Sequence, residues 1–260
     1  MRASLAGAGA REALERGGDG AVIASFRLAC YVRLEGGLVA LVEPTVHAGP
    51  IHLVLDGAPP RAATGARVRV VPGAVIVVGE GIDVSGARSW WGLLPRPSSI
   101  RDHADAIARV AAPAAARSPL LSEPFRVPAD GARKLLVAGL LEEAARRLVG
   151  LGPGLTPSGD DALAGVLFAL RASRGAELEP RASDLVGSLT GGVVSQAFVA
   201  WAARGQALAP AHDLLCAVVA GDDARARSSA RSLASVGETS GADFLLGMSW
   251  GLSTLSRGQS

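Results

Sequence analysis

The stretch GLGPGLTPSGDD (Gly150–Asp161) decides how the second half of the chain is built. It places four glycines, two prolines, two hydroxyl residues and two adjacent aspartates between two apolar, alanine-rich segments. A plain connection between two helices needs only a capping residue and one glycine. The additional glycines, prolines and polar residues predict that this loop does more than join two helices.

A reduced form of this stretch recurs near the C-terminus. Residues 158–170, SGDDALAGVLFAL, and residues 240–252, SGADFLLGMSWGL, share the frame S-G-x-D-x-L-x-G-x-x-x-x-L, with Thr156 and Thr239 as preceding hydroxyl residues. The apolar spacing predicts that both segments are helices that begin in the same way. Their glycines, Gly165 and Gly247, would allow the two helices to pack closely where they cross.

Two interpretations of the repeated motif are open. Ser-x-x-Asp before an apolar run is close to a capping box, in which serine and acid satisfy backbone N–H groups at a helix start. Alternatively, two helix N-termini that face each other would offer unpaired N–H donors and positive dipole ends to a phosphate or a small carboxylate. The residues predicted to hold that anion are Gly152, Gly154, Thr156, Ser158, Gly159, Thr239, Ser240 and Gly241.

The adjacent aspartates are predicted to have different roles, because neighbouring residues on a helix point about 100° apart. Asp161 recurs as Asp243, so both are predicted to cap a helix or to give polar support. Asp160 has Ala242 as its counterpart and is therefore the catalytic candidate, as a base, an acceptor for an amide or a Mg²⁺ ligand. An acid in a first helical turn is also favourable without any function. No metal site and no certain cofactor is predicted; Mg²⁺ is left open.

The periodicity outside the motif predicts an α+β protein. Residues 21–95 are expected to form a β-rich unit, an antiparallel barrel or sandwich, because short Val-, Ile- and Leu-rich runs alternate there with Gly, Pro or Asp. Residues 96–260 are expected to be mostly helical, with helices over 99–112, 129–149, 160–172, 181–204, 208–220, 223–235 and 240–256. Residues 1–20 are expected to form an N-terminal helix or a flexible arm. Strands followed by helices exclude the alternating pattern of a Rossmann fold.

The composition excludes several classes of protein. Hydrophobic residues make up 49% of the 260 residues, and the formal net charge is +2. Scattered arginines and few aromatics argue against a nucleic-acid surface. No apolar run is long enough for a membrane span, and two isolated cysteines, Cys30 and Cys216, fit a reducing cytoplasm.

The residues that carry a resemblance are GLGPGLTPSGDDALAG and, about 80 residues later, ETSGADFLLG. They resemble a bacterial family of unknown function that includes the third subunit of oxamate carbamoyltransferase. The segment TGGVVSQAFVAWAARGQALAP (residues 190–210) and, more weakly, LVEPTVHAGPIHLVL (residues 41–55) are similar to that family as well.

The resemblance implies carbamoyl transfer between oxalurate or oxamate and phosphate, in the breakdown of purines and allantoin. It implies a small anionic substrate bearing a carboxylate, phosphate or carbamoyl group. It also implies other protein subunits, one of which resembles acyl-CoA synthetases. Two alternatives stay open from the residues: a non-catalytic assembly subunit, whose glycines only pack helices, and an enzyme that uses Mg²⁺ and a nucleotide at the aspartate pair.

Overall fold

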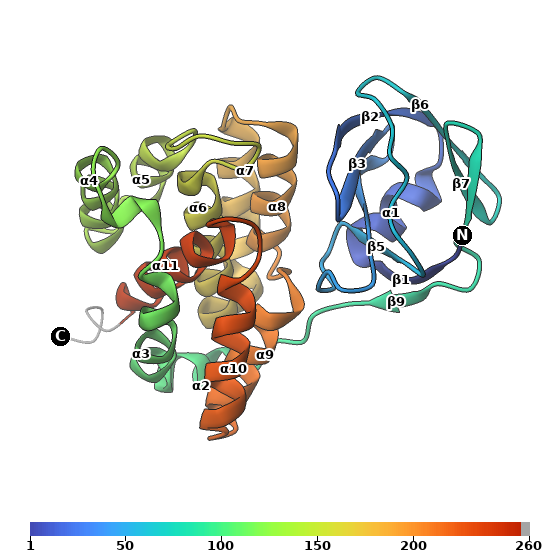
Figure 1. The fold of residues 1–260 in the computed structure, drawn as a ribbon. Coiled ribbons are helices and arrows are strands. Elements are labelled where there is room, and N and C mark those ends of the chain that lie inside the picture. Colours follow the sequence, from blue (N-terminus) through green and yellow to red (C-terminus); the bar gives the residue numbers. More distant parts are fainter. Residues whose placement is uncertain (256–260) are drawn as a thin grey trace. The chain divides into compact units, whose positions relative to one another are not determined.

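A computed structural model describes residues 1–255, apart from the side chains of residues 179–181. Residue 256 of the last predicted helix and residues 257–260 of the predicted helical unit lie outside the described residues. The chain divides into two compact units, Met1–Gly92 and Leu93–Ser260 (Figure 1). The first unit is β-rich and the second is helical, so the predicted α+β class is confirmed.

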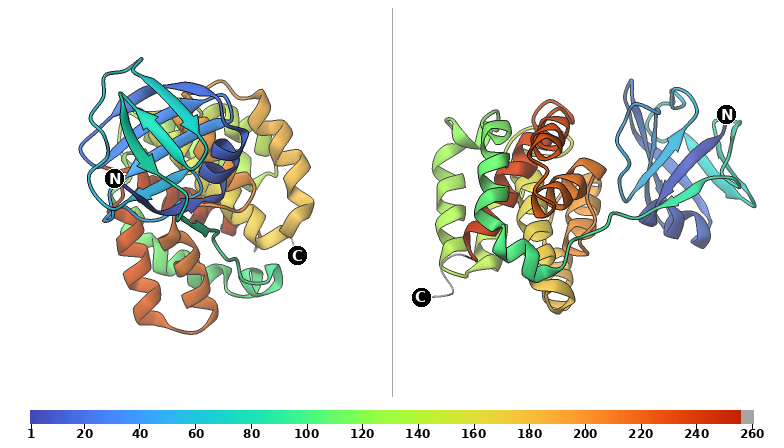
Figure 2. Two further views of the ribbon diagram at one scale, coloured as in Figure 1. Left: turned by 90° about the vertical axis from the view of Figure 1, so that its right-hand side faces the viewer. Right: turned by 90° about the horizontal axis from the view of Figure 1, so that it is seen from below.

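The first unit contains one nine-stranded sheet with the order β8-β7-β6-β2-β3-β4-β5-β1-β9. Its strands are β1 (Ala3–Gly7), β2 (Asp19–Ser25), β3 (Ala29–Leu34), β4 (Gly37–Val42), β5 (His52–Leu55), β6 (Arg67–Val71), β7 (Ala74–Val77), β8 (Glu80–Asp83) and β9 (Arg88–Trp90). The sheet curls into a half barrel (Figure 2). It is mixed, because β4 pairs with β5 and β1 pairs with β9 in parallel, whereas the other neighbours are antiparallel.

The N-terminal residues belong to this sheet and its core. β1 pairs with β5 and β9, and the helix α1 (Ala8–Arg16) follows it directly. Ala10 and Ala13 of α1 are buried with strand residues such as Val32 and Leu41. Small side chains on this helix therefore allow it to lie close to the curled sheet.

The second unit is a helical bundle. Its α-helices are α2 (Pro97–Asp102), α3 (Ala104–Ala115), α4 (Arg126–Val137), α5 (Leu141–Leu148), α6 (Ser158–Arg174), α7 (Glu179–Ser188), α8 (Val193–Ala203), α9 (Ala209–Val219), α10 (Asp223–Ala234) and α11 (Ser240–Ser253), with 3-10 turns η1 (Pro119–Leu121) and η2 (Gly175–Leu178). Two of the predicted helices, 129–149 and 181–204, are each divided into two helices in the structure. A left-handed residue, Gly139 (φ 79°), separates α4 from α5, and residues 189–192 separate α7 from α8.

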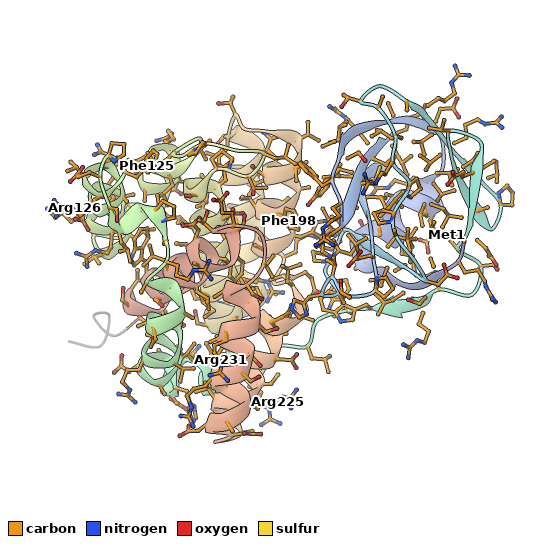
Figure 3. All side chains as sticks on the ribbon, viewed as in Figure 1. Met1, Phe125, Arg126, Phe198, Arg225 and Arg231 are labelled. Carbon is orange, nitrogen blue, oxygen red and sulfur yellow. The ribbon has the colours of Figure 1, made fainter. Side chains whose placement is uncertain are left out.

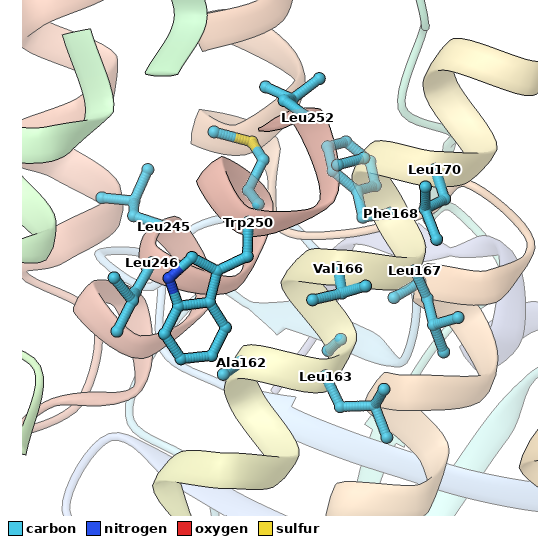
Figure 4. Packing of buried hydrophobic residues seen from close by; sticks show 14 of the residues in the cluster. Ala162, Leu163, Val166, Leu167, Phe168, Leu170, Leu245, Leu246, Trp250 and Leu252 are labelled. Carbon is cyan, nitrogen blue, oxygen red and sulfur yellow. The ribbon is translucent and has the colours of Figure 1, made fainter. Parts of the chain in front are cut away.

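The helix α6 lies at the centre of the bundle. Every residue of α6 is buried except Arg171 and Arg174, which explains why its sequence is apolar on all sides rather than on one stripe. It packs most extensively against α11 and also contacts α8 (Figure 4). In the described residues, no helix combines the length and the apolar character that crossing a membrane requires.

Charged side chains lie on the outside of this bundle. Arg126 on α4 and Arg225 and Arg231 on α10 point outward (Figure 3). Arg126 pairs with Glu123 (3.0 Å) and Arg225 pairs with Asp213 (2.6 Å). Local acids thus neutralise these two cations.

Candidate functional site

The loop before α6 needs its glycines for backbone geometry. Gly150, Gly152 and Gly154 have φ of 76°, 108° and 106°, in the left-handed region that side chains disfavour. The loop folds back on itself, and the Gly159 N–H donates to the Leu151 carbonyl (2.8 Å). Two predicted anion-binding glycines, Gly152 and Gly154, thus shape the loop.

The glycine that begins each repeated motif permits close backbone approach. An added Cβ at Gly159 would lie 2.0 Å from the Leu148 carbonyl oxygen at the end of α5. At Gly241 it would lie 1.7 Å from the Leu233 carbonyl oxygen of α10. In both motifs the new helix therefore starts against the end of the preceding one, and packing alone requires these glycines.

The next glycine of each motif lies where α6 and α11 cross. A Cβ on Gly165 would lie 2.0 Å from the Phe244 carbonyl oxygen, and a Cβ on Gly247 would lie 1.8 Å from the Ala162 carbonyl oxygen. Ala162 precedes Gly165 by three residues, and Phe244 precedes Gly247 by three. The crossing is therefore approximately two-fold symmetric, and the close packing predicted for these glycines is confirmed.

The same symmetry brings the two helix starts together. The Thr156 and Ser240 hydroxyl oxygens are 3.1 Å apart, although 84 residues separate them in the chain. The Asp161 carboxyl of α6 faces the hydroxyls of Ser240 and Thr156. The Asp243 carboxyl of α11 faces the hydroxyls of Ser158, Thr239 and Ser118.

The capping box suggested by the sequence does not form. The residue before α6 is Pro157, and Ser158 is already the first helical residue. Thr239 precedes α11 and makes no capping hydrogen bond with its side chain. Instead, the serine of each motif faces the aspartate of the other, so Asp161 and Asp243 give polar support between the two helices.

Burial dominates the electrostatics of these two acids. Asp243 is fully buried and Asp161 is 9% exposed, and the Oδ2 atom of each is buried without a hydrogen-bond partner. Burial raises the pKa of Asp161 to about 8, helped by the charges of Asp243 and Asp160 and opposed by the two hydroxyls. Burial also raises the pKa of Asp243, which accepts a short hydrogen bond from the Ser118 hydroxyl. At neutral pH, Asp161 therefore keeps its proton.

Asp160 points to a different place. It is only 3% exposed, and its Oδ1 accepts a hydrogen bond from the Gly150 N–H (2.7 Å). It lines a cavity with about 10 Å³ of space for the centre of a water-sized molecule, together with Gly191, Ser195 and Gln196. The catalytic candidate is thus a buried carboxylate beside a small cavity, rather than a solvated surface acid.

Four residues of this region are not among the site residues predicted from the sequence. Ser118 lies 125 residues before Asp243 in a proline-rich connection, and no local pattern marks it. Gly191, Ser195 and Gln196 come from the start of α8. The Gly191-Gly192 pair before an apolar helix was the available signal, since it resembles the glycine-rich entry of α6 in composition.

Two of the histidines, His52 and His212, are buried and hydrogen-bonded within the fold. His212 is buried; its Nε2 accepts from the Ala207 N–H (3.1 Å) and its Nδ1 lies 3.0 Å from the Leu93 carbonyl oxygen. His52 is buried as well, and burial lowers its pKa to about 4. Within the part of the chain that the structure describes, no group of three or more His, Cys, Asp or Glu side chains is arranged to hold a metal ion.

The fold and the site define a class: α+β proteins whose helical unit is organised around two crossed helices with reciprocal S-G-x-D starts. Residues 148–252, from the end of α5 through most of α11, match the family model described as oxamate carbamoyltransferase subunit AllH. The matched segment is similar to that family, and it contains both motifs. No curated protein and no solved structure matches the chain.

Proposed function

We propose that this chain is a component of an oxamate-carbamoyltransferase-like enzyme and that it binds a small anion where α6 and α11 begin. The observation that carries the proposal is the 3.1 Å approach of the Thr156 and Ser240 hydroxyls, which joins two helix N-termini. Each N-terminus contributes a positive dipole end, which favours an anion. Such a system interconverts oxalurate and phosphate with oxamate and carbamoyl phosphate, and every one of these ligands carries an anionic group.

The protonation state of Asp161 makes an anion compatible with two nearby acids. With a pKa of about 8, Asp161 is mostly neutral at pH 7 and can donate a hydrogen bond. A protonated Asp161 leaves at most one negative charge in the pair, and the Asp243 carboxyl accepts a hydrogen bond from the Ser118 hydroxyl. Gly152, Gly154, Gly159 and Gly241 set the backbone path that leads into the two helix starts. Ser158 and Thr239 face the carboxyl of Asp243.

Asp160 is the proposed catalytic residue, in the first turn of the same helix, α6. Its carboxylate is held at one oxygen by the Gly150 N–H, so the position of the other oxygen is fixed by the loop. A buried, oriented carboxylate is suited to accept a hydrogen bond or a proton from a nitrogen of the substrate. Carbamoyl transfer from carbamoyl phosphate to oxamate forms a C–N bond, releases phosphate and removes a proton from the oxamate nitrogen, which the Asp160 carboxylate would accept.

A specific observation also favours an assembly role. Leu155, in the loop before α6, and Val193, at the start of α8, are exposed by 40% and 37%. The Ser195 hydroxyl donates to the Leu155 carbonyl (3.3 Å), which brings these two apolar residues to one side of the site. We propose that another subunit of the enzyme, such as one resembling acyl-CoA synthetases, covers this surface.

Thermal melting of the full chain tests the anion site. Phosphate, carbamoyl phosphate, oxamate and oxalurate would be added singly to the wild type, to Thr156→Val and to Ser253→Ala. Ser253 is a matched control, because its hydroxyl donates to the Trp250 carbonyl of its own helix. A ligand at about 100 times its Kd adds about 2.7 kcal/mol, or roughly 5–10 °C.

We expect this shift in the wild type and the control and its loss in Thr156→Val. If none of the four anions shifts the melting temperature of the wild type, the proposed anion site is wrong. A shift that survives in Thr156→Val would place the anion elsewhere on the chain.

A further inference from the structure

The β-rich unit contains a cavity beside the place where its curled sheet nearly closes. The strand β8 forms one edge of the sheet, and a bridge between Arg2 and Asp83 brings that edge to the start of β1. A cavity of about 380 Å³ lies next to this junction, between β1, α1, the end of β6 and the residue after β8. Small-molecule pockets measure roughly 300–1,000 Å³ and are common in the mouths of β-barrels. The size and the place of this cavity therefore fit one small ligand.

One wall of the cavity is apolar. Leu14 of α1, Val70 of β6 and Val84 pack against the core of the sheet, but each of them is only half-buried. Val71 and Pro72 extend the same wall. Because burial of apolar surface is favourable, a ligand with an apolar body would be stabilised by covering these side chains.

Two opposite charges line the same cavity. Arg11 and Glu15 lie four residues apart on α1, and therefore on one face of the helix. Nη2 of Arg11 donates to the Ala87 carbonyl (2.8 Å), and its Nε is buried without a hydrogen-bond partner. The next charges on the helix, Glu12 and Arg16, pair with each other (3.9 Å). In the part of the chain that the structure describes, neither Arg11 nor Glu15 forms an ion pair.

We propose that this cavity binds an apolar α-amino acid. Arg11 holds its carboxylate, because a guanidinium presents several N–H donors to a carboxylate. Glu15 holds its ammonium group, and its side chain covers the wall of Leu14, Val70 and Val84. A single carbon joins the two charged groups of an α-amino acid, so one ligand can reach two side chains that are one helical turn apart.

This site goes beyond the proposed function. All of its residues belong to the unit Met1–Gly92, outside the residues 148–252 that match the family model. It shares no residue with the starts of α6 and α11, so its test is independent of the anion site.

Matched ligands separate the three parts of the proposed recognition. L-Valine, L-leucine and L-phenylalanine would be titrated singly into the full wild-type chain by calorimetry. The tightest of the three would then be compared with its amide, which lacks the carboxylate, with its deaminated acid, which lacks the ammonium group, and with glycine, which lacks the side chain. We expect each of these to bind about 10- to 100-fold more weakly than the amino acid.

Two variants assign each charge of the ligand to its partner. Glu15→Gln should weaken binding of the amino acid about tenfold or more and leave binding of the deaminated acid unchanged. Arg11→Gln should weaken binding of the amino acid similarly and leave binding of the amide unchanged. Glu80→Gln and Arg67→Gln are the controls, because both positions are exposed and neither lines the cavity.

Glu15→Gln decides the test if Arg11→Gln does not fold, since Glu15 is exposed and its replacement breaks no ion pair. Failure of the wild type to bind any of the three amino acids would overturn the inference. Equal affinity for the amino acid and its deaminated acid would overturn it too, and would identify a site for simple carboxylates. An unchanged affinity in Glu15→Gln would have the same consequence. None of these results would bear on the proposed function, which is tested with other ligands.

Discussion

Replacement of Asp161 by asparagine should change how stability depends on pH. Asp161 is buried and its pKa is raised to about 8, against about 3.9 in an unfolded chain. Between these two values the native state binds the proton and the unfolded state does not. The free energy of unfolding therefore falls as pH rises through this window, by about 1.4 kcal/mol per pH unit, and no further above pH 8.

The magnitude is large enough to measure. From pH 5 to pH 8 this single group should lower the free energy of unfolding by roughly 4 kcal/mol in the wild type. Asp161→Asn cannot ionise, so the difference between variant and wild type should shift in favour of the variant by that amount. Urea unfolding from pH 5 to pH 9, followed by circular dichroism at 222 nm, reports on the helical unit.

Asp102→Asn is the control, because it makes the same replacement at an exposed position of the helical unit. If the curves of Asp161→Asn and the wild type run parallel from pH 5 to pH 9, Asp161 is ionised in the native state and the reasoning is refuted. The protonated donor at the anion site would then be wrong as well.

Three further predictions concern the helix crossing and the acid pair. Gly165→Ala should destabilise the chain by more than about 3 kcal/mol or prevent folding, since its methyl would meet a backbone carbonyl, while Gly187→Ala should be neutral or stabilising in the same urea titration. Ser118→Ala should cost about 1–3 kcal/mol in the same titration, because it removes a hydrogen bond from the buried carboxyl of Asp243. Oxamate affinity, measured by calorimetry, should fall on the order of tenfold from pH 7 to pH 9, as Asp161 loses its proton and adds a negative charge beside the ligand; an unchanged affinity would place the anion away from the acid pair.

Local sequence patterns predicted much of this architecture for physical reasons. The spacing of hydrophobic residues changes from every second residue to about every 3.6 residues where the sheet ends and the bundle begins. The first spacing buries one face of a strand, and the second buries one face of a helix. Gly165 and Gly247 indicated that α6 and α11 cross closely, since a glycine at the same position in two similar helices is typical of a close helix–helix contact. By contrast, β1 (ASLAG) has no strand pattern, and its conformation follows from pairing with β5 and β9.

The candidate site was predictable in its parts but not in its connections. The hydroxyls and acids of both motifs are visible in the sequence, yet the exchange of partners between them depends on the angle at which α6 and α11 cross. The contact of Ser118 with Asp243 and the cavity between Asp160 and Gly191 join segments that are far apart in the chain. Burial of Asp160 could not be foreseen either, because an acid in the first turn of a helix is ordinarily solvated.

Packing explains the glycines of the motif but not its carboxyls. Gly159, Gly165 and Gly247 are required by backbone contacts within 2.0 Å of an added Cβ, and these contacts would exist without a ligand. A buried carboxyl with an unsatisfied oxygen costs stability, and an apolar side chain of similar volume would ordinarily serve a helix crossing better. Asp161 and Asp243 each contain such an oxygen. The part of the motif that packing cannot account for is therefore its acid pair, where a proton or a ligand donor completes the structure.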